Sequence, residues 1–170
     1  MDADVLSEVN VEIRKAELSD GDAIWEIWHA VVADGTTFVY APDTGKEEAF
    51  PLWMTPPSVT YVAVEGTQIV GSYILKPNQP GLGSHVANAG FIVAEGQFGK
   101  GIGRTMAQHA LEEARRGGFQ AMQFNFVVST NTRAVALWQS LGFGIIGTVP
   151  QAYRHQTLGY VDIHIMHRFL

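Results

Sequence analysis

The sequence contains no cysteine, and this absence excludes several kinds of chemistry. Without cysteine the chain has no disulfide, no thiolate ligand for a metal and no thiol nucleophile. Long apolar runs are lacking too, because none reaches the roughly 20 residues that a membrane-spanning helix needs. We therefore expect no membrane contact and no metal site, and we look to other groups for the chemistry.

Basic residues are scarce as well. The chain carries 11 Lys and Arg against 17 Asp and Glu, which gives a net charge of −6. This balance provides little attraction for a phosphate backbone, so nucleic acid is not an expected partner. The first ten residues contain three acids, whereas a signal peptide would have basic and apolar regions there. We expect a cytoplasmic protein.

The remaining composition indicates one globular domain. A chain of 170 residues with 46% apolar side chains is long enough for one full core and too short for two ordinary ones. Its apolar periodicity changes repeatedly between that of strands and that of helices, which indicates an α/β sheet. We predict a single domain over residues 1–170, with strands at 11–15, 59–65, 69–76, 86–94, 120–128, 144–149 and 160–168.

Sequence signals also place four helices between these strands. A capping-box-like pair, Ser19 and Asp22, is expected to start the first helix. An N-cap at Asn131 is expected to start the last one. The two helices between them are expected over 44–54 and from residue 103 to Gly117.

A glycine-rich segment joins the strand at 86–94 to the third helix. It reads Phe98-Gly99-Lys100-Gly101-Ile102-Gly103-Arg104, and all seven residues are candidates for binding a phosphate group. The N–H groups at the start of a helix and the positive end of its dipole can converge on an anion, and glycine lets the backbone approach closely. The alternative for this segment alone is a strand-to-helix turn without a ligand.

Two nucleotide-binding motifs fit this segment poorly. A Walker loop would end in Gly-Lys followed by Ser or Thr, which is missing here. A dinucleotide-binding fingerprint would need G-x-G-x-x-G directly after the first strand-to-helix turn of the chain. The diphosphate of another cofactor is therefore the better interpretation.

At this segment the sequence resembles the GNAT acetyltransferases. Their signature is Gln or Arg, two residues, Gly, one residue, then Gly or Ala, and here it falls on Phe98, Gly101 and Gly103. Phe98 replaces the polar first residue, while the glycine cradle is kept. The resemblance implies acetyl-coenzyme A as cosubstrate and the GNAT acyl-coenzyme A acyltransferase fold, which is α/β. That fold has a mixed, mostly antiparallel sheet of six to seven strands, splayed in the middle and flanked by about four helices.

A second block carries the same resemblance. The segment from Asn131 to Phe143 matches the family pattern Asn-x-x-Ala-x-x-Leu-Tyr followed by Gly-Phe. The resemblance implies that Asn131 contacts the cofactor as well as capping its helix. Trp138 stands where relatives often have a Tyr that protonates the leaving thiolate, and an indole is no practical acid. Either water performs this step, or Tyr153 does.

The strand before the phosphate segment has a role by resemblance as well. In the family this strand splays from the next one, and its free backbone groups receive the pantetheine arm of the cofactor. Counted by the family's spacing, Val93 would bond the pantetheine. The N–H of Phe91 would polarise the acetyl carbonyl, which is an oxyanion-type role.

Three stretches, 85–91, 124–127 and 150–162, are similar to a narrower group of fungal and bacterial acetyltransferases that modify proline analogues such as azetidine-2-carboxylate. This similarity implies that the acceptor is an amino acid or imino-acid analogue, with Asn88 and Asn125 at its amine and carboxylate. Both are polar residues in strands that otherwise read as buried, where an amide must be hydrogen-bonded. The alternative is that they bond neighbouring backbone where the sheet splays.

Two further segments are candidates for the walls of the acceptor pocket. Tyr153-Arg154-His155 lies in a loop predicted over 150–159, with Arg154 available for a substrate carboxylate. An exposed loop without a ligand is the alternative there. By resemblance, Thr36, Thr37 and Phe38 form the opposite wall. Each candidate proton acceptor also has an ordinary structural interpretation; the candidates are His85, His155, Asp162 and His164.

Three functions are open at this level. The leading interpretation is direct transfer of acetyl from acetyl-coenzyme A to the amino group of a small molecule in a ternary complex. Acetylation of a protein N-terminus or a lysine is the second. A non-catalytic acyl-coenzyme A sensor is the third, because Trp138 replaces the usual acid. The sequence leaves the oligomeric state open, with a homodimer as one option.

Overall fold

A seven-stranded sheet forms the centre of the computed structural model, which describes residues 10–170. Neighbouring strands are antiparallel except β4 and β5, which run parallel, so the expected mixed, mostly antiparallel sheet is confirmed. The predicted absence of a signal peptide concerns residues that, apart from Asn10, lie outside this range. In sheet order the strands are β1 (Glu12–Lys15), β2 (Val59–Glu65), β3 (Gln68–Pro77), β4 (Val86–Val93), β5 (Ala121–Val128), β7 (Gly159–Phe169) and β6 (Gly144–His155).

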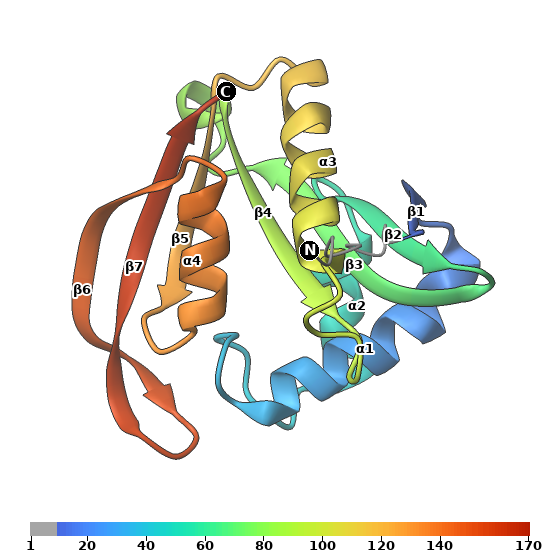
Figure 1. The fold of residues 1–170 in the computed structure, drawn as a ribbon, viewed down its shortest axis with the longest axis horizontal. Helices are drawn as coiled ribbons and strands as arrows, with labels where there is room; N and C mark the ends of the chain where they lie inside the picture. Colours follow the sequence, from blue (N-terminus) through green and yellow to red (C-terminus); the bar gives the residue numbers. More distant parts are fainter. Residues whose placement is uncertain (1–9) are drawn as a thin grey trace, which may run out of the picture.

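Four helices cover the two faces of this sheet, as the family resemblance implied (Figure 1). On one face α1 (Gly21–Asp34) and α2 (Lys46–Met54) pack with Ile74 and Ile92 of the sheet. On the other face α3 (Ile102–Arg116) and α4 (Thr132–Ser140) pack with Tyr73 and Leu75. Side chains alternate between the faces along each strand, which divides the core into two clusters. None of the helices over residues 10–170 has the length and apolar character needed to cross a membrane.

The sheet opens between β4 and β5. The two strands pair only at Val86 with Ala121 and at Ala87 with Met122, and beyond these pairs they diverge (Figure 1). An irregularity of β5 between Phe124 and Val127 shifts its pairing with β7 at the same level. The backbone of β4 that would otherwise pair with β5 is therefore available to a ligand. The expected splay is confirmed.

The C-terminal hairpin differs from the prediction. A loop was expected over 150–159, but β6 continues to His155 and β7 begins at Gly159. The expectation failed because Pro150 was treated as the end of the strand, although an edge strand tolerates proline. The carboxylate of Asp162 accepts a hydrogen bond of 2.9 Å from the N–H of Gln151, whose φ is 50°. This contact stabilises an irregular turn within β6, after which pairing with β7 resumes.

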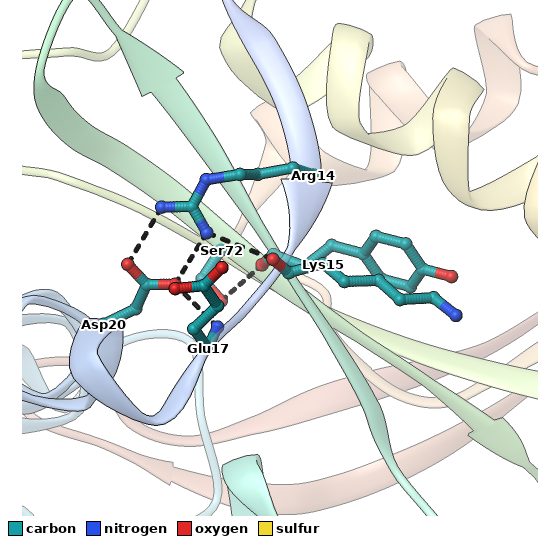
Figure 2. A network of polar contacts seen from close by, with 6 residues as sticks. Arg14, Lys15, Glu17, Asp20 and Ser72 are labelled. Atoms are coloured by element: carbon teal, nitrogen blue, oxygen red, sulfur yellow. Dashed lines mark hydrogen bonds and ion pairs between the residues drawn. The ribbon is translucent and has the colours of Figure 1, made fainter.

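The start of α1 also differs from the prediction. The capping box was expected at Ser19 and Asp22, but it is formed by Glu17 and Asp20, followed by a 3-10 turn over Leu18–Asp20. The carboxylate of Asp20 accepts hydrogen bonds from both terminal nitrogens of Arg14, at 2.7 and 2.9 Å, and from the N–H of Glu17 at 2.7 Å. Figure 2 shows these donors converging on one carboxylate. Three charged or polar contacts outweigh the single cap predicted at exposed Ser19.

This carboxylate gives a prediction about stability. The Arg14 hydrogen bond lowers the pKa of Asp20 below its usual value. A group whose pKa is lowered by folding stabilises the native state above its unfolded pKa, and this stabilisation is lost as the pH falls through the folded pKa. We expect Asp20→Asn to reduce the free energy of unfolding at pH 7 by about 1.5 kcal/mol, the low end for charged hydrogen bonds, because Arg14 is partly exposed.

Urea denaturation of the wild type and the variant at pH 7 and near pH 3 measures this effect. The difference between the two proteins should shrink at the lower pH. Asp22→Asn is the matched control, because Asp22 is exposed and pairs with exposed Lys46. Asp22→Asn should reduce the free energy of unfolding by much less than Asp20→Asn does. A loss for Asp20→Asn that is equal at both pH values would contradict the role of its charge.

Candidate active site

The glycine-rich segment forms a tight turn that opens α3. Gly99 and Gly101 have φ values of 78° and 82°, in the left-handed region that favours glycine. Gly101 is the N-cap of α3, and the buried side chain of Ile102 fixes the first turn of the helix in the core. The N–H groups at this helix end are therefore exposed around a turn that can hold an anion.

Three cationic side chains surround this turn, although the chain as a whole is acidic. Lys100 Nζ lies 2.9 Å from Gln97 Oε1, and Arg104 donates to Ser140 Oγ of α4 at 2.8 Å. The guanidinium of Arg133, on α4, lies 5.7 Å from the ring centre of Phe98. Sequence reasoning missed Arg133. Its position two residues after the predicted N-cap Asn131 was the available signal, because both helix starts lie at this turn.

Two polar contacts hold α3 against the sheet. The hydroxyl of Tyr73 lies 2.7 Å from His109 Nδ1, and the hydroxyl of Tyr61 donates to Glu113 at 2.9 Å. Burial raises the pKa of Tyr61 to about 12, and its hydrogen bond to Glu113 adds to this effect. Both tyrosines therefore stay protonated at neutral pH. These contacts fix the helix whose N-terminus follows the glycine-rich turn.

Aromatic side chains line the α3 and α4 side of the open region of the sheet. The ring of Phe91, on β4, lies 5.1 Å from that of Trp138, on α4, and Trp138 lies 4.5 Å from Phe124, on β5. Trp138 is only 8% exposed. Val93 follows on the same face of β4 as Phe91 and packs against the same cluster. The structure thus brings the predicted cofactor residues of β4 and α4 together between the diverging strands.

Asn131 is the N-cap of α4, as predicted. Its side-chain oxygen accepts a hydrogen bond of 3.3 Å from the N–H of Ala134. The side-chain nitrogen of Asn131, Nδ2, makes no hydrogen bond among the contacts of residues 10–170. The side chain can therefore cap its helix and still donate a hydrogen bond to a ligand.

A chain of amides lies on the opposite face of the sheet, where β4 and β5 separate. Asn88 donates from Nδ2 to the backbone carbonyl of Gln123 at 2.9 Å. Gln123 Nε2 donates to Asn125 Oδ1 at 2.9 Å, and Asn125 Nδ2 donates to Asn78 Oδ1 at 2.6 Å. This amide cluster, residues 78, 88, 123 and 125, includes Asn78 and Gln123, which sequence reasoning missed because their spacing matches no motif.

The two predicted asparagines differ in burial from the expectation. Both were expected in buried strands, but Asn88 is half-buried and Asn125 is exposed. Asn125 is exposed because the irregularity of β5 moves this strand away from β4. The bond from Asn88 to the carbonyl of Gln123 is the structural alternative that the sequence left open. It leaves Asn88 Oδ1 free to accept a hydrogen bond, since Nδ2 alone makes this contact.

The two predicted walls of the acceptor pocket meet. The hydroxyl of Tyr153 donates to the backbone carbonyl of Phe38 at 3.0 Å, and the N–H of Gln156 donates to the carbonyl of Gly35 at 3.0 Å. Thr36 and Thr37 lie half-buried in the same loop. The ring of Phe126, next to Asn125, lies 6.1 Å from that of Tyr153. The C-terminal hairpin and the loop after α1 therefore contact each other, and the hairpin also contacts the residue that follows Asn125 on β5.

Arg154 does not share this wall. Tyr153 and His155 lie on one face of β6, with ring centres 6.4 Å apart, and Tyr153 contacts Phe38. Adjacent side chains of a strand point to opposite faces, so Arg154 faces away from the loop after α1. It was proposed for a substrate carboxylate because Tyr153-Arg154-His155 was expected as one wall in a loop between the last two strands. The extended strand takes the place of that loop.

The hydroxyl of Tyr153 is also engaged. Its hydrogen bond to Phe38 directs it toward the loop after α1, and its ring packs with Val128 and Ile163, while Trp138 packs in a different cluster. Burial and the nearby charge of Asp34 raise the pKa of Tyr153. The structure therefore does not bring Tyr153 to Trp138. Water is the simpler donor for the leaving thiolate.

Three of the four candidate proton acceptors have structural partners. Asp162 accepts from Gln151, and His164 Nδ1 lies 2.9 Å from Thr148 Oγ. His155 Nδ1 accepts the N–H groups of Thr157 and Leu158, both at 3.2 Å, so the neutral ring carries its proton on Nε2. His85 is exposed just before β4. Among residues 10–170, no hydrogen bond joins any of the four to the amide cluster.

Across residues 10–170, no group of three or more His, Asp or Glu side chains is placed to hold a metal ion.

The comparisons with known proteins agree with the geometry. The model of the acetyltransferase (GNAT) family matches residues 23–143. The N-acetyltransferase aca1 of Schizosaccharomyces pombe is 41% identical over 102 residues, which is 58% of this chain and 48% of that protein. The chain thus spans about half the length of this relative.

Two solved structures share the fold over nearly the whole chain. A GCN5-related N-acetyltransferase from Kribbella flavida is 49% identical with a TM-score of 0.90, covering 94% of this chain and 98% of that one. The protein yncA from Salmonella typhimurium, solved with its cofactor acetyl-coenzyme A, is 25% identical with a TM-score of 0.80. That match covers 95% of this chain and 94% of yncA.

Proposed function

This chain belongs to the acetyltransferase (GNAT) family, and from that premise we propose that it transfers an acetyl group from acetyl-coenzyme A to the amino group of a small molecule. The observation that carries the proposal is the combination of two features at one opening of the sheet. A glycine-rich turn that can hold an anion lies at one end of the separated strands, and the amide cluster lies on the face opposite α3 and α4.

The cofactor would be held mainly by backbone. The N–H groups of the turn from Gly99 to Gly103 would bind its diphosphate, with Lys100, Arg104 and Arg133 offsetting the charge. The pantetheine arm would lie between β4 and β5, bonded to the backbone of Val93 and to the Asn131 amide. Trp138 and Phe91 would pack against the arm and the acetyl group.

The reaction is a direct displacement. The neutral amine nitrogen attacks the thioester carbonyl, and the C–S bond breaks as the C–N bond forms. The N–H of Phe91 stabilises the negative charge that develops on the carbonyl oxygen. The attacking nitrogen loses a proton to water, and a water molecule protonates the departing thiolate. The chain contributes mainly by positioning the two reactants.

The acceptor class follows from the amide cluster. Asn88 and Asn125 can orient an amine and a carboxylate without ionising themselves. The loop after α1, with Thr37 and Phe38, meets the C-terminal hairpin, with Tyr153 and His155, beside the strand that carries Asn125. A wall at this place would favour a small acceptor over a peptide. We include amino acids and imino-acid analogues such as azetidine-2-carboxylate in this class.

A thiol-release screen tests the proposal. The protein is incubated with acetyl-coenzyme A and either small amines, including cyclic imino acids, or peptides with free N-termini and lysines. We expect free thiol only with small amines. Release with peptides alone would contradict the acceptor class, and binding of acetyl-coenzyme A without any thiol release would contradict an enzymatic function.

A further inference from the structure

The amide cluster lacks a charge that a carboxylate acceptor would need. Its four side chains are all neutral amides that donate or accept hydrogen bonds. Amides can orient a carboxylate, but moving that charge out of water is costly unless a cation or several donors compensate. A site for an amino or imino acid should therefore have a cation beside the amides.

Lys76 occupies that position. It lies on β3 directly opposite Asn88 in the antiparallel register of β3 and β4. Directly opposite residues have Cβ atoms about 4.5–5.5 Å apart on one face of the sheet. Lys76 continues the row of Ser72 and Ile74, which face α1 and α2, so it shares the face that carries the amide cluster.

The ammonium group of Lys76 has no acidic partner among residues 10–170. The three ion pairs of this part of the chain involve Arg14, Lys46 and Arg116. Lys76 is half-buried, so its aliphatic stem packs on the sheet while its ammonium group can reach a ligand. Arg154, the cation expected from the sequence, faces away from the wall at Phe38. Lys76 is thus the cation that the strand register brings to the amides.

We infer that Lys76 binds the carboxylate of the acceptor, and that the acceptor is an amino or imino acid whose amine lies toward the opening between β4 and β5. This inference rests on the proposed function and defines its substrate class. Lys76 supplies the charge, Asn88 and Asn125 supply directional hydrogen bonds, and Asn78 positions Asn125 through its 2.6 Å contact.

The experiment compares two acceptors that differ only in the carboxylate. The kcat/KM of azetidine-2-carboxylate and of azetidine-2-carboxamide is measured for the wild type, Lys76→Gln and Lys76→Arg. We expect Lys76→Gln to lower kcat/KM for the acid by about 10- to 100-fold. The value for the carboxamide should change by less than about threefold, and Lys76→Arg should retain most of the preference for the acid.

The control variant is Lys15→Gln, because Lys15 is an exposed lysine on β1, at the far edge of the sheet. Lys15→Gln should leave kcat/KM for the acid and for the carboxamide unchanged. If Lys76→Gln does not keep its melting temperature, Lys76→Met, which keeps an aliphatic stem, replaces it. A folded variant that keeps the wild-type preference would overturn the role of Lys76 and leave the proposed function intact. Equal use of acid and carboxamide by the wild type would contradict the acceptor class and Lys76 together.

Discussion

Gly101→Val is expected to abolish useful binding of acetyl-coenzyme A. Gly101 has a φ of 82° at the N-cap of α3, and a β-branched residue is strongly disfavoured there. Relaxation of this strain would turn the N–H groups of the first helical turn away from the diphosphate. Loss of two hydrogen bonds to a charged group costs about 1.5–3 kcal/mol each. This loss raises the dissociation constant for acetyl-coenzyme A by at least about 100-fold.

Thermal denaturation measures this effect. Acetyl-coenzyme A at one hundred times its wild-type dissociation constant should stabilise the wild type by about 2.7 kcal/mol and leave Gly101→Val almost unchanged. The matched control is Gly118→Val, because Gly118 follows α3 with a φ of 80° and open space around it. Both variants carry similar backbone strain. The assignment of the turn fails if Gly101→Val folds and shows the wild-type stabilisation.

Asn125→Ala and Asn88→Ala are expected to have the second largest effects, on the acceptor. Each removes a hydrogen bond to the proposed amine or carboxylate, which costs about 0.5–1.5 kcal/mol for a neutral partner and about 1.5–3 kcal/mol for a charged one. This range corresponds to an increase in the acceptor KM, or a decrease in turnover, of about 2- to 150-fold. The KM for acetyl-coenzyme A should change little, because the amide cluster lies on the face opposite α3 and α4.

Asn131→Ser is the reciprocal variant. Serine can keep the helix cap, whereas the amide donor proposed for the cofactor is lost. Asn131→Ser should weaken the binding of acetyl-coenzyme A and leave the order of kcat/KM among the acceptors unchanged. Steady-state kinetics on variants that keep the wild-type melting temperature gives both constants. If Asn88→Ala and Asn125→Ala both retain wild-type acceptor kinetics, the two residues are structural, as the bond from Asn88 to the Gln123 carbonyl would then explain.

Local signals predicted the parts of the fold that depend on few residues. The N-cap at Asn131 followed from one side chain and its helix, and the turn before α3 followed from its glycines. The opening between β4 and β5 followed from the family resemblance, and the structure shows it in two remaining strand pairs. For the N-cap and the turn, a short segment determines its own conformation, and distant contacts change it little.

Contacts between residues of different elements decided the rest. The position of Asp20 depends on Arg14, and the length of the C-terminal hairpin depends on the bond from Gln151 to Asp162. The exclusion of Arg154 from the wall follows from that hairpin, and the place of Lys76 beside Asn88 follows from strand register. The loop between β3 and β4 is too long for its turn type to fix their register from the sequence, so the place of Lys76 could not be predicted.

The most direct test of an acetyl transfer is the stoichiometry of its products. Purified protein is mixed with acetyl-coenzyme A and azetidine-2-carboxylate, and free thiol and N-acetylated product are quantified together by thiol titration and mass spectrometry. We predict that the two products appear in equal amounts, and that omission of the amine leaves only slow background thiol release. Thiol release at the same rate without the amine, or no acetylated product with any small amine tested, would contradict the account.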